Sequence, residues 1–272
     1  MCLIAFSWQP EHGRLHLLAN RDEFYARPTA PAHWWPDDAN IWAGRDLKAK
    51  GTWLGLTREG RFAALTNVRE SAALSGEQSR EKRSRGELVA DFLRTQTGCE
   101  DYLQQVLSRG DEYPGFNLLL GDMNRGELWY ANNRSDADAR RLEAGLYGLS
   151  NAILDTPWPK VERLKQGLAE LSSVRDETAF GLLDDDTRAA LDQLPNTGVG
   201  PEWESLLSSI FIQSPDYGTR AQTVLCVEQG RVVVTEHGRG PQGAELERRQ
   251  ASWLLAEPKP EPELMSRHGN RV

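Results

Sequence analysis

Short apolar runs alternate with turn-forming residues along the first quarter of the chain. Each run is rich in large apolar or β-branched residues and is bounded by Gly, Pro, Asn or Asp, which is typical of strands joined by hairpins. The runs are CLIAFSW (2–8), RLHLLAN (14–20), GTWLGL (51–56) and RFAALTN (61–67). This pattern predicts that the N-terminal run forms a strand inside a sheet.

Apolar residues recur at helical spacing in two later regions. LVADFL (88–93) follows SRGE, in which Ser84 and Glu87 have the spacing of a capping box, and a second helix is expected over 101–108. From 158 to 207 the helical period dominates again, most clearly in VERLKQGLAEL.

Further strand patterns lie between and after these helices. They are FNLLLGD (116–122), ELWYAN (127–132), GLYGLS (145–150), QTVLCVE (222–228) and RVVVTEH (231–237). The last two flank a short QG turn and predict a hairpin. Strands in two groups with helices between them predict an α+β fold in which helices cover antiparallel sheets. We expect one domain over 1–256 and a flexible tail over 257–272.

The charge of the chain restricts its partners. The formal net charge is −8 and the pI is near 5.3. Nucleic acids and anionic membranes attract a positive field, so we expect neither as a partner. The most basic stretch, 78–87, mixes both signs and predicts an exposed loop. Because no apolar run approaches the roughly eighteen residues of a spanning helix, we expect no stable membrane insertion and a cytoplasmic location.

Cysteine and histidine are sparse and widely spaced. Cys2, Cys99 and Cys226 form no CxxC pattern and are too few for a disulfide framework, which favours a reducing compartment. The five histidines lack ligand spacing such as HExxH, and His16 and His33 are interpreted as surface or satisfied residues. The spacing therefore predicts no structural metal and no bound cofactor.

Cys2 differs chemically from the other two cysteines because of its position. If the initiator Met1 is removed, Cys2 carries both a thiol and a free α-amine. A thiol with a pKa of about 8.5 is only a few per cent thiolate at pH 7, and an α-amine with a pKa of roughly 7.7 to 8.0 can accept its proton. Cys2 is therefore a candidate nucleophile with its own base, or else a small apolar residue on a buried strand.

Polar residues follow three of the predicted apolar runs. NRDE (20–23) comes after the apolar residues that end at Ala19, and Asn67 and Asn151 each end a predicted strand. A carboxylate can hold an ammonium group, an arginine can bind an anion through two hydrogen bonds, and an amide NH2 can donate to an oxyanion. The alternatives are a charged turn for NRDE and turn or cap roles for the asparagines.

Seven motifs in this order resemble the NRDE-motif family, also called the transport and Golgi organisation family. They are MCLIAF, ANRDEFYARPT, GTWLGL, LTNVRE, SRGEL, YGLSNAILDTPWPKV and YGTRAQTVL. The resemblance extends from residue 1 to about 236, and NRDE and SNAxLDTPWPK are its specific parts. That family is similar to the Ntn hydrolases of the choloylglycine-hydrolase and penicillin-V-acylase kind. The resemblance implies an αββα sandwich of two antiparallel sheets between helix layers.

The resemblance also implies a set of site residues. They comprise a nucleophile that attacks an amide carbonyl, a charged pair beside it, two asparagines near the oxyanion and a later arginine. The matching residues are Cys2, Arg21, Asp22, Asn67, Asn151 and Arg220. Which of Arg21, Asp22 and Glu23 meets the Cys2 amine stays open.

Two functions follow from this set. The first is an Ntn-type hydrolase of a linear or cyclic amide, which requires removal of Met1. The family is also associated with haem trafficking and lipid homeostasis, so the alternative is a non-catalytic carrier or chaperone of an apolar ligand such as haem. HWWP (33–36), Trp42 and Trp53 could line an apolar pocket or simply fill the core. In both cases the expected partner is a small molecule.

Overall fold

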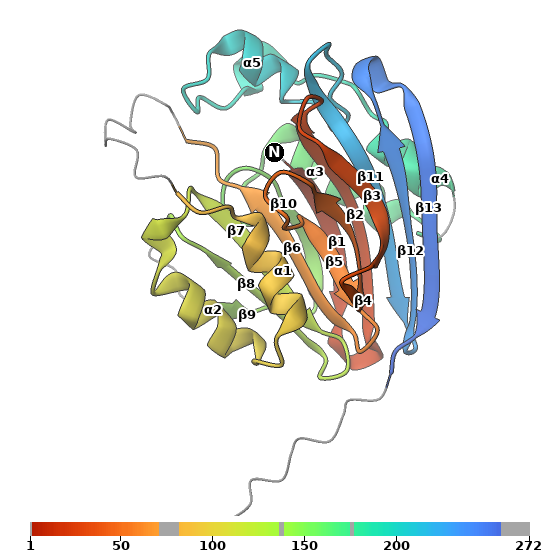
Figure 1. The fold of residues 1–272 in the computed structure, drawn as a ribbon. Helices are drawn as coiled ribbons and strands as arrows, with labels where there is room; N and C mark the ends of the chain where they lie inside the picture. The colour runs from red at the N-terminus through yellow and green to blue at the C-terminus, as the bar shows by residue number, and fades with distance from the viewer. Residues whose placement is uncertain (1, 71–81, 136–138, 175–176, 257–272) are drawn as a thin grey trace, which may run out of the picture.

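Two antiparallel sheets form the centre of the molecule (Figure 1). The computed structural model describes residues 2–70, 82–135, 139–174 and 177–256. Sheet A contains, in spatial order, β10 (Gly145–Leu149), β1 (Cys2–Gln9), β2 (Arg14–Phe24), β11 (Tyr217–Glu228), β12 (Arg231–Arg239) and β13 (Glu245–Leu254). Sheet B contains β3 (Thr29–Trp35), β4 (Asp38–Asp46), β5 (Leu54–Thr57), β6 (Arg61–Asn67), β7 (Phe116–Asp122), β8 (Glu127–Asn132) and β9 (Arg140–Arg141).

Buried apolar clusters define the layers. The cluster between the sheets takes alternate residues of β1 and β2, such as Ile4 and Leu17, together with residues of sheet B such as Leu56. A second cluster joins sheet B to α1 (Gly86–Arg94) and α2 (Cys99–Leu107). A third joins sheet A to α3 (Pro159–Glu170) and α4 (Glu177–Leu183). The order is helices, sheet B, sheet A, helices, which confirms the αββα arrangement of an α+β fold.

Strand β1 lies inside sheet A, between β10 and β2, as its apolar run predicts. Its residues from Leu3 to Phe6 are all buried because sheet B covers one face and α3 covers the other. A strand that is buried on both faces has no polar alternation, which explains the continuous run CLIAF.

Helix α3 packs unusually close to the backbone of β10. A Cβ placed on Gly148 would lie 2.4 Å from Cγ1 of Val161 and 2.7 Å from Cδ of Lys165, so only glycine fits there. Pro159 occupies the first helical position, where its missing N–H costs no hydrogen bond. Together these features fix the start of α3, and with it Lys160, against sheet A.

The hairpin predicted around QG is confirmed. Gln229 and Gly230 both have positive φ, 49° and 71°, as a two-residue turn between twisted strands requires. The NRDE stretch differs from prediction: β2 continues through it to Phe24, so the charged-turn alternative is wrong. The capping box is also wrong, since the residue at the N-cap of α1 is Arg85 and no side chain caps the helix.

Other predictions were incomplete or lie outside the described residues. The helical region 158–207 is divided into several short elements: α3, α4, the 3-10 helix η3 (Leu191–Gln193) and the short α5 (Pro201–Leu206). The expected tail, 257–272, and part of the basic stretch, residues 78–81, fall outside the described ranges. Within those ranges, no helix has both the length and the apolar character needed to cross a membrane.

Candidate active site

Cys2 and Arg21 are direct neighbours across β1 and β2. The antiparallel register pairs them, and each stands two residues from a member of the cluster between the sheets, Ile4 for Cys2 and Ala19 for Arg21. Because residues two apart on a strand share a face, both side chains lie on the inner face of sheet A. Arg21 is 6% exposed, and its guanidinium lies over the ring of Trp53 at 4.1 Å. Trp53, directly before β5 of sheet B, therefore holds the arginine beside the cysteine by a cation–π contact.

A small cavity lies beside the thiol. Its volume is about 10 Å³, and Cys2, Ile4, Arg21, Trp53 and Leu65 contribute to its wall. Such a volume holds about one water molecule. Burial of the Cys2 thiol raises its pKa, so the thiol of this form of the chain is protonated at neutral pH and weakly nucleophilic.

Asp22 points to the opposite face of sheet A. It is 1% exposed, and its Oδ1 accepts a hydrogen bond of 2.8 Å from Oγ1 of Thr219 on β11. Burial raises the pKa of Asp22, and the positive charge of Lys160 is the strongest influence in the other direction. Two of the three charged residues of NRDE thus lie on different faces: Arg21 faces the cavity and Asp22 faces the helix layer.

Lys160 is the buried cation that faces Asp22. It is the second residue of α3 and only 2% exposed. Burial lowers the pKa of Lys160 to about 8, while the charge of Asp22 acts to raise it. A nearby buried ion pair, Arg69 Nη1 to Glu204 Oε2 at 2.6 Å, lines a second small cavity together with Lys160. Lys160, Arg69 and Glu204 thus form a second buried group of charged residues, on the helix-facing side of sheet A.

The two candidate asparagines, one at the end of β6 and one in the loop after β10, are joined by a hydrogen bond. Asn151 donates from Nδ2 to the backbone oxygen of Asn67 at 3.0 Å, and its own backbone oxygen accepts from Arg69 N at 2.7 Å. Ser150 Oγ donates to the backbone oxygen of Cys2 at 3.3 Å. Within the described residues the side-chain amide of Asn67 makes no hydrogen bond, so it can still donate to a ligand.

A buried polar network holds the Ser150–Asn151 loop against sheet B. Asn117 donates from Nδ2 to Thr66 Oγ1 at 3.0 Å and to the backbone oxygen of Ala152 at 2.8 Å. Tyr130 donates its hydroxyl to Asn117 Oδ1 at 2.6 Å and accepts from Leu154 N at 3.1 Å. The loop is thereby fixed by side chains of three strands, β6, β7 and β8.

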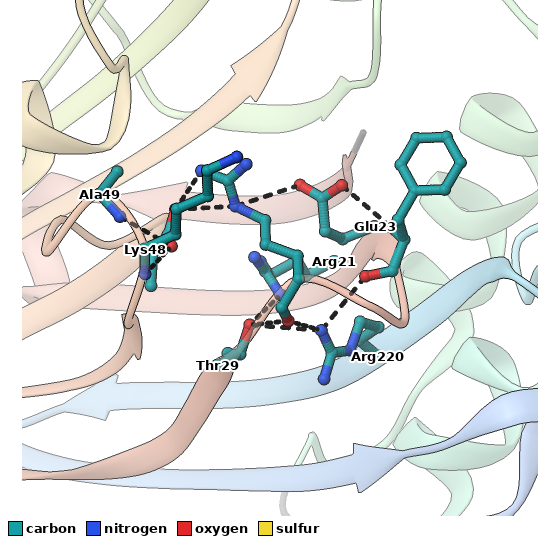
Figure 2. Close-up of polar contacts among 9 residues, drawn as sticks. Arg21, Glu23, Thr29, Lys48, Ala49 and Arg220 are labelled. Atoms are coloured by element: carbon teal, nitrogen blue, oxygen red, sulfur yellow. Dashed lines mark hydrogen bonds and ion pairs between the residues drawn. The ribbon is translucent and has the colours of Figure 1, made fainter.

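Arg220 reaches the same end of the sheets but lies at its rim. It occupies a bulge of β11, between the residues paired with Asp22 and Arg21. Figure 2 shows Arg21 and Arg220 directed toward Thr29, whose Oγ1 accepts from Nη1 of each at 3.4 Å. Arg220 also donates to the backbone oxygen of Arg27. Glu23 has different partners. Its carboxylate lies 3.9 Å from Nε of Arg27 and accepts a hydrogen bond from the backbone N of Phe24.

Two residues near Cys2 were given no role in the sequence prediction. Lys160 is one, and Arg85 is the other. Burial lowers the pKa of Arg85, and among the charged groups that act in the other direction Cys2 is the strongest. Arg85 Nη1 donates to the backbone oxygen of Gly115 at 2.9 Å. Both residues stand in motifs that carried the resemblance, SRGEL and DTPWPKV, and membership of those motifs was the available signal.

The structure thus gathers all six candidate residues at one end of the two sheets. Cys2 and Arg21 share the cavity, and Asp22 lies on the other face of the sheet, with Arg220 in the bulge of β11. Asn151 is bonded to Asn67 and follows Ser150, which is bonded to the backbone of Cys2. The arrangement provides a thiol, amide donors and charges of both signs within one region. Such a set suits nucleophilic attack on a carbonyl.

Comparison with known proteins places the chain in a family. Residues 1–240 match the family model described as Transport and Golgi organisation 2. Transport and Golgi organization protein 2 homologs from Bos taurus and Homo sapiens are 38% and 36% identical to it over 259 residues, covering 87% of this chain and 92% of theirs.

Among solved structures, an N-acylethanolamine-hydrolyzing acid amidase ortholog from Caenorhabditis elegans aligns with 67% of this chain and 85% of its own. The sequence identity is 13% and the TM-score is 0.45. The family match and the two homologs, in contrast, extend over most of the sequence. The chain belongs to the Transport and Golgi organisation 2 family.

Proposed function

We propose that this protein is an N-terminal-nucleophile hydrolase that cleaves an amide bond of a small molecule in the cytoplasm. Cys2 becomes the first residue when Met1 is removed. Its thiol then attacks the amide carbonyl carbon while its α-amine takes the thiol proton. The family description names a cellular process and no reaction, so the proposal depends on the chemistry of the site.

The proposed reaction has two steps. In the first, the sulfur–carbon bond forms, the carbon–nitrogen bond breaks, and the proton held by the α-amine passes to the leaving amine. In the second, water attacks the resulting thioester, the α-amine accepts a proton from that water, and the carboxylic acid leaves as the thiol is restored. The amide groups of Asn67 and Asn151 are the candidate donors to the oxyanion in both steps.

The pairing of Cys2 with Arg21 is the observation that carries this proposal. Asp22 follows Arg21 on β2, and its charge acts on Cys2, the residue that carries the α-amine after processing. A carboxylate there can hold the ammonium form, and the charge of Lys160 favours the ionised state of that carboxylate. Arg21 remains on the inner face to bind the carbonyl or an anionic part of the substrate.

The cavity beside Cys2 limits what can bind without movement. At about 10 Å³ it admits neither an amide substrate nor haem, so a ligand of either kind requires the walls to separate. No specific observation favours the carrier function. We therefore propose hydrolysis alone.

The test is the intact mass of the purified protein before and after a brief iodoacetamide pulse at neutral pH. We expect loss of Met1 and fast alkylation of Cys2, which disappears in Cys2→Ala. Cys99 and Cys226 are 3% and 2% exposed and serve as slow internal references. Hydrolysis of a panel of N-acyl amides, followed by amine release, completes the test. Retained Met1, or a Cys2 that reacts no faster than Cys99, would rule out the mechanism.

A further inference from the structure

Three side chains of types that can bind a metal ion meet on the outer face of sheet A, far from Cys2. His16 of β2 and Cys226 of β11 are paired across the strands, and Glu228 lies two residues beyond Cys226 on the same face. His16 pairs with Ser7 on β1, five positions from Cys2, which is about 17 Å at roughly 3.4 Å per residue. The group is therefore separate from the candidate active site.

The ligand atoms of these three residues are already close together. The thiol sulfur, an imidazole nitrogen and a carboxylate oxygen all lie within 4.8 Å of one another, and His16 Nε2 is 2.9 Å from Glu228 Oε1. Zinc bonds of about 2.0 to 2.3 Å in a tetrahedral site place neighbouring ligand atoms roughly 3.3 to 3.8 Å apart. Small side-chain movements are enough to reach that geometry.

The chemical types of the ligands select the metal. A thiolate and an imidazole favour Zn²⁺ and similar transition-metal ions over Mg²⁺ or Ca²⁺, which prefer oxygen ligands. Three protein ligands leave a fourth tetrahedral position open. Cys226 is 2% exposed, whereas the side chains of His16 and Glu228 are 21% and 27% exposed, so solvent reaches the group from the side of these two residues.

Arg14 is the charged neighbour that a cation must tolerate. Its Nε is 2.9 Å from Glu228 Oε1, and its Nη1 donates to Gln9 Oε1 at 2.9 Å. Glu228 has two carboxylate oxygens, so one can bind the metal while the other keeps the ion pair. In that arrangement Arg14 orients the ligand from outside the coordination sphere, as hydrogen-bonded partners commonly do at metal sites.

We propose that His16, Cys226 and Glu228 form a binding site for a divalent transition-metal ion of the Zn²⁺ type. Binding releases the thiol proton of Cys226 to solvent and links β2 to β11 at the end of sheet A away from Cys2. The competing interpretation is a structural contact in which His16 and Glu228 form an ion pair over a buried cysteine. Metal titration separates the two.

The experiment is a titration of the full-length protein with Co²⁺, which reports a bound thiolate by its charge-transfer absorption in the near ultraviolet. We expect the band to saturate at one equivalent and to disappear when Zn²⁺ displaces Co²⁺. Cys226→Ser should abolish the band, and Cys2→Ser and Cys99→Ser, the matched controls, should keep it. His16→Gln and Glu228→Gln should weaken Co²⁺ binding tenfold or more.

A variant that fails to fold would confuse the result, so circular dichroism accompanies each titration. If Cys226→Ser unfolds, His16→Gln provides the decisive measurement, since its side chain lies at the rim. Absence of the band at one equivalent in the wild-type protein overturns the proposal. A band that persists in folded Cys226→Ser or is unchanged in folded His16→Gln overturns it too.

Discussion

Arg21 lies directly opposite Cys2 on the neighbouring strand and at the same time covers the Trp53 ring at 4.1 Å. The guanidinium is thus held between the two sheets, one strand away from the thiol. Its positive charge acts against the burial that raises the pKa of Cys2. Sheet B therefore influences the reactivity of a residue on sheet A through a single aromatic ring.

Replacement of this arginine by lysine should separate stacking from charge. Arg21→Lys keeps a positive charge but loses the planar contact with Trp53 that holds this charge beside the thiol. We therefore expect a loss of stability of about 0.5 to 2 kcal/mol and slower alkylation of Cys2. Arg45→Lys is the matched control, because Arg45 also lies 4.1 Å over a tryptophan, Trp35. Urea midpoints and iodoacetamide rates measure both effects. Equal alkylation rates in the two variants would contradict a role for Arg21 at the thiol.

Asp22 and Lys160 should be energetically coupled. Asp22→Asn leaves the buried Lys160 without its carboxylate, and we expect it to destabilise the protein by about 3 to 5 kcal/mol. In the double variant Asp22→Asn with Lys160→Met, both charges are gone, so the loss should be smaller than the sum of the two single losses. Urea denaturation of the four proteins gives the coupling energy. Simple additivity would show that the two residues do not interact.

Lys160 should also make stability depend on pH at alkaline values. Burial lowers its pKa from 10.5 to about 8, so between those values the unfolded chain binds more protons than the folded one, and stability rises with pH. The full effect of this pKa difference is about 3 kcal/mol. The free-energy difference between wild type and Lys160→Met should therefore be constant below pH 8 and change steadily above it. A difference that stays constant up to pH 10 would refute the lowered pKa.

Glu236 on β12 should produce the opposite slope at acidic pH. It is 4% exposed, its Oε1 accepts a hydrogen bond of 2.7 Å from Ala32 N, and burial raises its pKa from 4.5 to about 7. Between those values the folded chain binds more protons, so this residue stabilises the fold fully below pH 4.5 and loses about 3 kcal/mol by pH 7. Glu236→Gln keeps the acceptor for Ala32 and should remove that slope. Parallel stability curves for the two proteins would contradict this assignment.

Strands with local signals could be predicted, and strands without them could not. CLIAFSW and the QG hairpin carry apolar runs and turn residues, and both were found. The strands β3 and β4 were missed because prolines and irregular pairing, such as the shift between Ala30 and His33, interrupt their alternation. Strand β13 was missed because nearly all of it is exposed and it pairs with sheet A at one edge only.

The candidate site shows a similar limit. The sequence indicated that NRDE is a polar stretch with a functional role. The face of the sheet on which each side chain lies, however, depends on pairing between β2 and β11, whose residues lie some two hundred positions apart in the chain. Lys160 meets Asp22 only because α3 covers sheet A. The expectation of no metal used short-range spacing alone, and such spacing cannot detect side chains that meet across a sheet, as those of His16 and Cys226 do.

The bulge at Arg220 gives β11 one residue more than β2 needs. Thr219 pairs with Asp22 and Ala221 pairs with Arg21, so the inserted position lets one strand support the helix-facing carboxylate and the cavity-facing guanidinium at once. Arg220 thus contributes in two ways: its backbone fills the inserted position, and its side chain supplies a guanidinium. A substitution there removes only the guanidinium, whereas a deletion turns Thr219 away from Asp22, since a one-residue slip exchanges the two faces of a strand.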